Sequence, residues 1–289
     1  MATEYLNDGS TSIAAANWAT SDGAAGAGIA SGNTNTYYIA SGSQSITSGL
    51  DQSGLADGVD ALTILPGFTG NIGDATASLR IGTHSTGANA KVEYAAGGGS
   101  LFLAAAAVDA NTIGTFSMTA TARAYLTGGT FTTLHLALGL LVVGPSAVLT
   151  NAYVYGGQSV IDAGATGTLL EVFGGTHVVR RAFTTIRVYG GSVAYQVDDS
   201  DLDATSLYVY PGGTFMHVNG DITNRYIYGT YDASRLRRSV VFTVSQYWPT
   251  AIYGKSGVGV TVTPGTETTH GLSLTNTNRT GSGSGSFPA

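Results

Sequence analysis

The stretch VYGG at Val154–Gly157 recurs with small changes three more times along the chain. The other copies are VFGG at Val172–Gly175, VYGG at Val188–Gly191 and VYPGG at Val209–Gly213. Aligned on the valine, successive copies lie 18, 16 and 21 residues apart, and one more step of 18 reaches Ile227. A propeller blade takes about 40 residues, whereas a repeat near 18 residues matches one coil of a β-solenoid.

In each copy, an apolar residue and then a variable residue precede the valine, and an aromatic residue follows it. We number these four positions from the apolar residue. Because side chains alternate across a strand, we expect the first and third to point inward and the other two outward. Stacked coils would then bring Glu171 and Arg187 together as a weak surface ion pair. They would also place the outward rings in one column. The predicted column consists of Tyr155, Phe173, Tyr189, Tyr210 and Tyr228.

The Gly-Gly pair that ends each copy predicts a corner, because glycine adopts positive φ without steric penalty. A second short run with alternating apolar residues follows each corner, as in THVV at Thr176–Val179. We therefore predict an all-β fold, a parallel β-helix (β-solenoid) with coils of about 18 residues. A β-sandwich or jelly roll with glycine-rich hairpins is the structural alternative.

Composition divides the 289-residue chain into three parts. Residues 1–60 form a Gly/Ser/Ala-rich arm, residues 61–245 the solenoid body, and residues 246–289 a C-terminal segment that ends in a Gly/Ser tail. Stretches this rich in small residues are usually flexible. Trp18, Tyr37 and Tyr38 interrupt the arm. They indicate that part of the arm docks onto another surface.

Charge and apolar patterning exclude several classes of protein. Only 10% of the residues are charged, against about 25% in typical domains. The net charge of −6 argues against a nucleic-acid binder. The most apolar stretch, residues 134–149, is too short to span a bilayer, and the polar N-terminus lacks the apolar region of a secretory signal. We expect a protein made in the cytoplasm that has neither a nucleic-acid nor a membrane partner.

The acidic run DDSDLD is the main candidate for cation binding or catalysis. Its carboxylates are Asp198, Asp199, Asp201 and Asp203. Alternating carboxylates can bind Ca²⁺, and carboxylate pairs can cleave glycosidic bonds. The run lacks the glycine and the distal glutamate of a calcium loop, so a solvated turn is the simpler interpretation. With no metal-ligand spacing among the five histidines and no hydrolase or Walker motif, we predict no enzyme activity, no catalytic or metal-binding residue and no cofactor.

Three explanations compete for the outward column of rings. Such a stripe would be unusual on the free surface of a monomer. The chain's own arm could cover it, it could form the seam of a homo-oligomer, or it could bind the rings of a host glycan.

The chain resembles bacteriophage virion β-helix proteins, which include head-decoration, head-fibre and tailspike-type proteins. The resemblance rests on Asn17–Trp18 in a Ser/Thr/Gly-rich setting, on coils punctuated by Gly-Gly and on the missing secretory signal. The resemblance covers most of the chain, but it lies in the general sequence pattern, and none of its motifs is diagnostic of one protein. It implies a non-enzymatic component of the virion, commonly trimeric, whose N-terminal region attaches to the major capsid protein or another virion protein. Trp18, Tyr37 and Tyr38 would then be attachment residues.

We therefore expect a capsid decoration or cement protein on the outside of a phage head, made in the host cytoplasm and assembled as a homo-oligomer, with a trimer favoured. The first alternative is a tailspike or tail-fibre protein that binds or cleaves host surface polysaccharide. The chain departs from enzymatic tailspikes in its length and in lacking an evident carboxylate pair. The second alternative is a bacterial surface adhesin.

Overall fold

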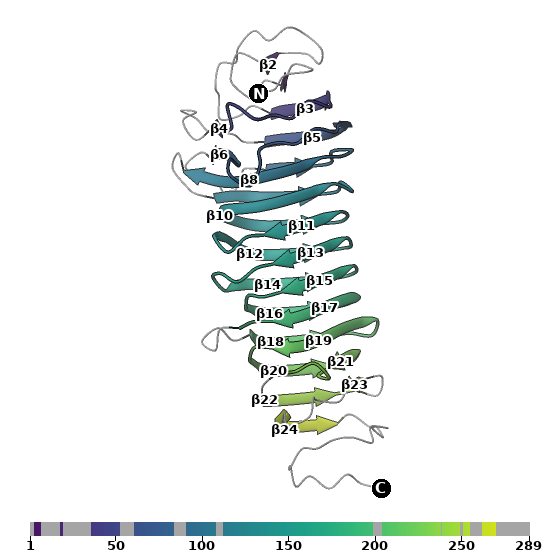
Figure 1. Ribbon diagram of the computed structural model, residues 1–289. Helices are drawn as coiled ribbons and strands as arrows, with labels where there is room; N and C mark the ends of the chain where they lie inside the picture. Colours follow the sequence, from purple (N-terminus) through teal and green to yellow (C-terminus); the bar gives the residue numbers. More distant parts are fainter. Residues whose placement is uncertain are drawn as a thin grey trace. The chain divides into compact units, whose positions relative to one another are not determined.

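Successive coils of the chain pair in parallel and in register in the computed structural model, as the stacked strands of Figure 1 show. Among the described residues there are strands and no helix, so none of them forms a helix able to cross a lipid bilayer. The fold is the predicted parallel β-solenoid with a spacing near 18 residues. The structure describes residues 3–6, 18–19, 36–52, 61–83, 91–107, 112–198, 204–237, 239–248, 251–254 and 262–269.

The chain divides into two units, Met1–Ala165 and Thr166–Ala289, which we call unit 1 and unit 2. In each unit the strands form two sheets. In unit 1, sheet 1 contains β1 (Thr3–Leu6), β2 (Trp18–Ala19), β3 (Thr36–Gly42), β5 (Ala61–Phe68), β7 (Lys91–Tyr94), β9 (Thr112–Met118), the second half of β10 (Arg123–Leu136) and β12 (Ala147–Val154). Sheet 2 contains β4 (Asp51–Gln52), β6 (Leu79–Thr83), β8 (Ser100–Ala107), the first half of β10, β11 (Leu140–Val143) and β13 (Gln158–Ile161).

In unit 2 the strands before each corner form sheet 1 and the strands after it form sheet 2. Sheet 1 contains β14 (Gly167–Val172), β16 (Phe183–Val188), β18 (Ala204–Val209), β20 (Ile222–Ile227), β22 (Val240–Tyr247) and β24 (Val262–Thr269). Sheet 2 contains β15 (Thr176–Val179), β17 (Gly191–Gln196), β19 (Gly213–Asn219), β21 (Thr230–Asp232) and β23 (Ile252–Gly254).

The predicted alternation of inward and outward side chains is confirmed in unit 2. Val172, Val188 and Val209 lie opposite one another in the register and are fully buried. A parallel inward column begins with Leu170, Ile186 and Leu207. Because each inward aliphatic side chain packs on its equivalent in the next coil, the core is a set of continuous columns rather than a central cluster. Fully burying one such side chain contributes about 1.5–3 kcal/mol.

Parallel pairing extends into both segments that were predicted as arm and tail. β3 pairs with β5, and Tyr37 and Ile39 of β3 are buried. β24 pairs with β22. Strands thus occur on both sides of the predicted boundaries at residues 60 and 245, while the three-part division of function stays a prediction.

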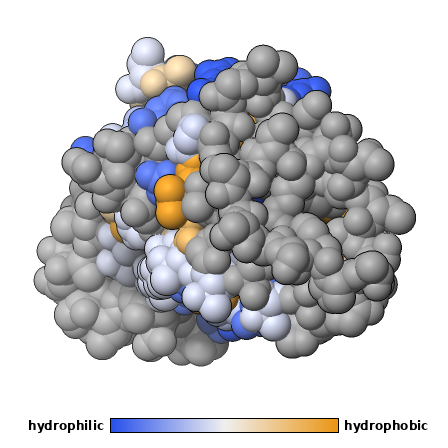
Figure 2. Space-filling view, turned by 90° about the horizontal axis from the view of Figure 1, so that it is seen from below, coloured by the Kyte–Doolittle hydropathy of each residue, from blue (hydrophilic) through white to orange (hydrophobic). Residues whose placement is uncertain are grey.

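The surface is polar without being highly charged. In the end-on view of Figure 2, the coloured residues are mostly hydrophilic or neutral, and strong hydrophobic colour is confined to small groups.

The glycine corner is confirmed by the backbone conformation. Gly157, Gly175 and Gly191 have φ of +70°, +86° and +70°. At Gly191 a Cβ atom would lie 2.6 Å from the carbonyl carbon of Gly174 and 2.6 Å from the carbonyl oxygen of Gly175. The corner therefore needs glycine twice over, for its φ and for the close approach of the preceding coil.

Replacing Gly191 by alanine is expected to lower the free energy of unfolding by about 1–3 kcal/mol, because strain at positive φ adds to a backbone clash. The matched control is Gly128→Ala, where φ is not in the positive range and a Cβ would have no neighbour within 4 Å. The control should stay within about 0.5 kcal/mol of the parent chain. Denaturant titrations of both variants measure the difference, and equal losses would contradict the corner argument.

His177 of β15 is buried, and its Nε2 lies 2.8 Å from the carbonyl oxygen of Gly174. Burial lowers the pKa of this imidazole below 6.5, and the hydrogen bond to Gly174 counteracts part of that effect. Below pH 6.5 the unfolded chain therefore binds a proton at this site more readily than the folded chain, and stability decreases as the pH falls.

We expect the free energy of unfolding to fall between pH 7.5 and 5.5, and to fall less in His177→Gln than in the parent chain. Denaturant titrations at a series of pH values give both slopes, and the other histidines, present in both proteins, cancel in the comparison. Identical slopes would show that His177 does not carry this pH dependence.

Candidate functional site: the aromatic face of unit 2

Five stacked rings run along the outward face of sheet 1 in unit 2, and we call them the ring ladder. Neighbouring ring centroids lie 4.8, 4.4, 5.4 and 3.8 Å apart, and the interplanar angles are between 5° and 22°. The ring ladder consists of Phe173, Tyr189, Tyr210, Tyr228 and Trp248. Its spacing follows from the sheet, since adjacent strands lie about 4.7–4.9 Å apart.

Trp248 extends the ring ladder beyond the column predicted from the sequence. The residue before it, Tyr247, lies opposite Ile227 and takes the inward position that valine fills in the four VYGG-like copies. The motif search therefore passed over this coil. A search that allowed any apolar or aromatic inward residue would have found it.

The ring ladder has phenol groups that remain protonated at neutral pH. Partial burial raises the pKa of Tyr189, and the nearby Glu171 and Tyr210 raise it further. Partial burial and the neighbouring Tyr210 likewise raise the pKa of Tyr228. These hydroxyls therefore keep their protons at neutral pH.

A second outward column lies two residues before the ring ladder on each strand. Tyr208 and Tyr226 stack there with centroids 4.6 Å apart. On the preceding coils the same column holds Glu171 and Arg187, and Arg187 Nη1 donates to Glu171 Oε1 at 2.8 Å. The predicted ion pair is thus confirmed, and its hydrogen bond raises the pKa of Arg187. We call the ring ladder together with Tyr208 and Tyr226 the aromatic face.

The ion pair neutralises its own charges on the aromatic face. The guanidinium of Arg187 also lies 5.9 Å from the ring centroid of Tyr208, at the long end of a cation–π contact. The outward positions that follow along this column are Tyr226 and Gln246. The aromatic face therefore presents rings, hydroxyls and amides to a partner, with little net charge.

A threonine occupies the position four residues before the inward valine or its equivalent on five strands of unit 2. The threonines are mostly exposed and lie near the N-terminal ends of the strands of sheet 1. They are Thr168, Thr184, Thr205, Thr223 and Thr243. The repeat is therefore longer than VYGG. Alignment on the valines shows the threonine column in the sequence, but our sequence comparison missed it because it began at the apolar residue two positions before each valine.

Arg225 occupies an inward position that leucine or isoleucine fills in the preceding coils of unit 2. It lies opposite Leu207 and Ser245 and is only 1% exposed. Its Nε donates to Ser245 Oγ at 2.9 Å, and its Cζ lies 3.8 Å from the ring centroid of Phe242. The rings of Tyr231 and Tyr247 lie 5.1 and 5.2 Å from the same carbon.

Such a guanidinium is stabilised by the aromatic faces around it, because the π electrons attract the cation and the protein excludes water. Close by, His217 is buried and hydrogen-bonded to the hydroxyl of Tyr231 and, at 2.8 Å, to the carbonyl oxygen of Gly220. The core therefore changes from aliphatic to polar and aromatic toward the C-terminal coils. We assign Arg225 a structural role.

The remaining predicted site residues outside the acidic run belong to unit 1. Tyr155 belongs to unit 1, is 50% exposed and stacks with His135 at 6.0 Å. Tyr37 is buried in β3, whereas Tyr38 is partly exposed. The backbone of Trp18 lies in β2, and its side chain lies outside the described residues.

The acidic run is only partly described. Asp198 Oδ1 accepts a hydrogen bond from Asn219 Nδ2 at 2.9 Å. Asp199, Asp201 and Asp203 lie outside the described residues. Within the described ranges, no three acidic or histidine side chains come together in a way that could hold a metal ion. The cation-site hypothesis for this run stays a prediction.

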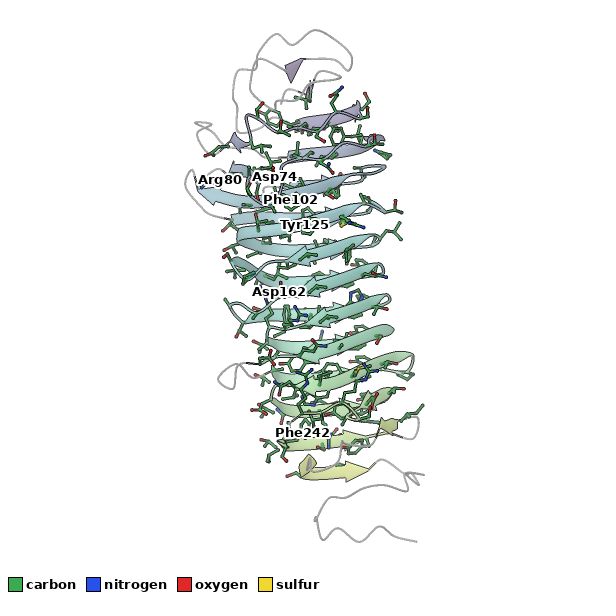
Figure 3. All side chains as sticks on the ribbon, in the orientation of Figure 1. Asp74, Arg80, Phe102, Tyr125, Asp162 and Phe242 are labelled. Carbon is green, nitrogen blue, oxygen red and sulfur yellow. The ribbon has the colours of Figure 1, made fainter. Side chains whose placement is uncertain are left out.

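Unit 1 carries a smaller outward stack on sheet 2. Phe102 of β8 and Tyr125 of β10 are stacked with centroids 4.4 Å apart and an interplanar angle of 7° (Figure 3). Ring stacking thus accompanies coil stacking in both units. This pair provides a matched control for experiments on the ring ladder.

Comparisons with protein-family models, with curated proteins and with solved structures found no match to this chain.

Replacing Tyr210 by alanine is expected to lower the free energy of unfolding by about 1–3 kcal/mol, because two stacked contacts of about 0.5–1.5 kcal/mol each are lost. Tyr210→Phe keeps both contacts and should stay within about 0.5 kcal/mol of the parent chain. Denaturant unfolding of both variants measures these values. If the alanine and phenylalanine variants were equally stable, the stacked rings would not contribute to stability.

Proposed function

We propose that this protein is a structural, non-catalytic component of a bacteriophage particle, and more specifically a decoration protein bound to the outside of the head. The observation that carries the proposal is the aromatic face of unit 2, a regular array of partly exposed rings held by in-register strands. The class of particle comes from the sequence resemblance and from the low charge of the chain.

The composition of the aromatic face supports a role in binding protein. Tyrosine, tryptophan and phenylalanine are enriched in the cores of protein interfaces, and charged residues are depleted there. Phe173 at one end of the ring ladder is 41% exposed although it is a large apolar side chain. A contiguous stripe of this kind marks an interaction surface more often than a free surface.

Ring orientation favours a protein partner over a glycan. Sugars bind aromatic side chains by lying against an open ring face. In the ring ladder each ring face is covered by the neighbouring ring, as with Tyr189 and Tyr210, which are nearly parallel at 4.4 Å. Only ring edges and hydroxyl groups are presented along the interior of the ring ladder. The tailspike alternative therefore gains no support from this surface.

The proposal is tested on particles purified from the lysate in which the protein is produced. We expect the protein in the purified particles, and electron microscopy should place it on the outside of the head. Trp18→Ala should fold with unchanged circular dichroism but be depleted from particles at least tenfold, whereas the conservative Trp18→Phe should be retained.

Absence of the parent protein from the particles would overturn the structural proposal. Normal retention of Trp18→Ala would overturn the assignment of Trp18 to attachment and would leave the particle location intact. Release of new reducing ends from host polysaccharide by the purified protein would replace the proposal with the tailspike alternative.

A further inference from the structure

The ring ladder cannot interdigitate with another set of rings. Neighbouring centroids are 3.8–5.4 Å apart, and the rings are nearly parallel. Inserting a further ring would require roughly twice this separation, because carbon atoms in contact are about 3.5–4.0 Å apart. A two-fold contact in which two ring ladders interlock is therefore sterically excluded. The partner must present a flat surface to the ring edges.

Sheet 2 of unit 2 has such a surface on its outward side, and we call it the flat face. Its outward side chains are short or unbranched, uncharged and at least partly exposed. They are Thr176 and Val178 of β15, Ser192, Ala194 and Gln196 of β17, and Thr214 and Met216 of β19. Among the described residues, charged side chains stand at its margins at Arg180, Asp198 and Asp232, and Asp232 lies opposite Met216 on the next strand, β21.

The flat face has the same period as the ring ladder. Val178, Ala194 and Met216 lie opposite one another in the register of sheet 2, so they recur once per coil. The rings of sheet 1 also recur once per coil. A second copy of this solenoid can therefore place the three strands of its flat face, β15, β17 and β19, opposite three successive rings.

We infer that the ring ladder of one copy lies along the flat face of a second copy, with the coil axes aligned. This inference rests on the proposed binding role of the aromatic face and specifies its partner. The contact joins two different surfaces. In a pair of copies, the flat face of the first and the ring ladder of the second therefore remain free for further contacts. Contacts of this heterologous type form a closed ring when the rotation between copies closes and a filament when it does not.

The chemistry of the two surfaces fits this contact. The ring edges of the ring ladder carry partial positive charge. The flat face supplies hydroxyl and amide acceptors at Ser192, Gln196 and Thr214. Since neither surface carries unpaired charge at its centre, little ionic desolvation opposes association.

Two single substitutions test the contact in the full-length chain. Tyr210→Arg disables the ring ladder, and a planar guanidinium can still stack between Tyr189 and Tyr228, so the fold is kept. Ala194→Arg disables the flat face at an outward, partly exposed position. Val241→Arg is the matched control, because Val241 is 71% exposed and lies outside both surfaces. Light scattering coupled to size-exclusion chromatography measures the mass of each protein.

We expect an oligomer for the parent chain and for Val241→Arg, and monomers for Tyr210→Arg and Ala194→Arg. An equimolar mixture of the two monomeric variants should form a species with the mass of two chains. One variant retains the flat face and the other retains the ring ladder, so one intact contact can form between them. Circular dichroism checks the fold, and Tyr228→Arg and Met216→Arg replace any variant that fails to fold.

A monomeric parent chain would overturn the inference, as would oligomers of both disabled variants. A mixture that stays monomeric would also overturn it, because a heterologous contact must be rescued in this way. The result is independent of the particle experiment. A monomer found in particles would keep the proposed function and remove the inference, whereas an oligomer absent from particles would do the reverse.

Discussion

In-register parallel pairing between successive coils is the constraint on which the other features of this protein depend. Val172, Val188 and Val209 lie opposite one another because the parallel strands of successive coils pair in register. A residue type that recurs at the same position of every coil therefore forms a continuous column of side chains along the solenoid. The aliphatic core, the glycine corner and the ring ladder are three columns of one lattice.

Column formation also explains the unusual composition of the chain. Outward residues are satisfied by their equivalents above and below, as with Tyr189 on Tyr210 or Arg187 on Glu171. Each such column is stabilised by stacking or hydrogen bonding along the coils. Interactions of this kind involve hydroxyl groups and rings as well as charges, in keeping with a chain of which only 10% is charged.

Sequence analysis predicted the solenoid, the direction of each side chain in the VYGG copies and the ion pair between Glu171 and Arg187, because all three follow from a period and an alternation. It did not find Trp248, because the inward residue of that coil is a tyrosine. It did not predict that Arg225 is buried either. The rings that surround its guanidinium, Phe242 and Tyr247, come from the next coil, and no local pattern announces them.

The partner of the ring ladder could not be predicted from the sequence for a related reason. A column of rings allows several partners, from a covering arm to a glycan, and the choice among them narrows only when the orientation of the ring planes is known. Near-parallel rings such as Tyr210 and Tyr228, at 5°, turn their edges outward, and this orientation depends on side-chain torsions that residue spacing does not specify.

The polar core around Arg225 makes its coil different from the coils that have aliphatic side chains at the same inward position. The inward positions Ile186 and Val188 of β16 and Leu207 and Val209 of β18 are all aliphatic, so duplication of such a strand would leave these two columns of sheet 1 undisturbed. The coil that carries Arg225 has no such freedom, because its guanidinium requires Ser245 and Phe242 on one particular side. A coil inserted directly after Arg225 would separate its guanidinium from Ser245 and Phe242, so the order of the coils is fixed at this point of the solenoid.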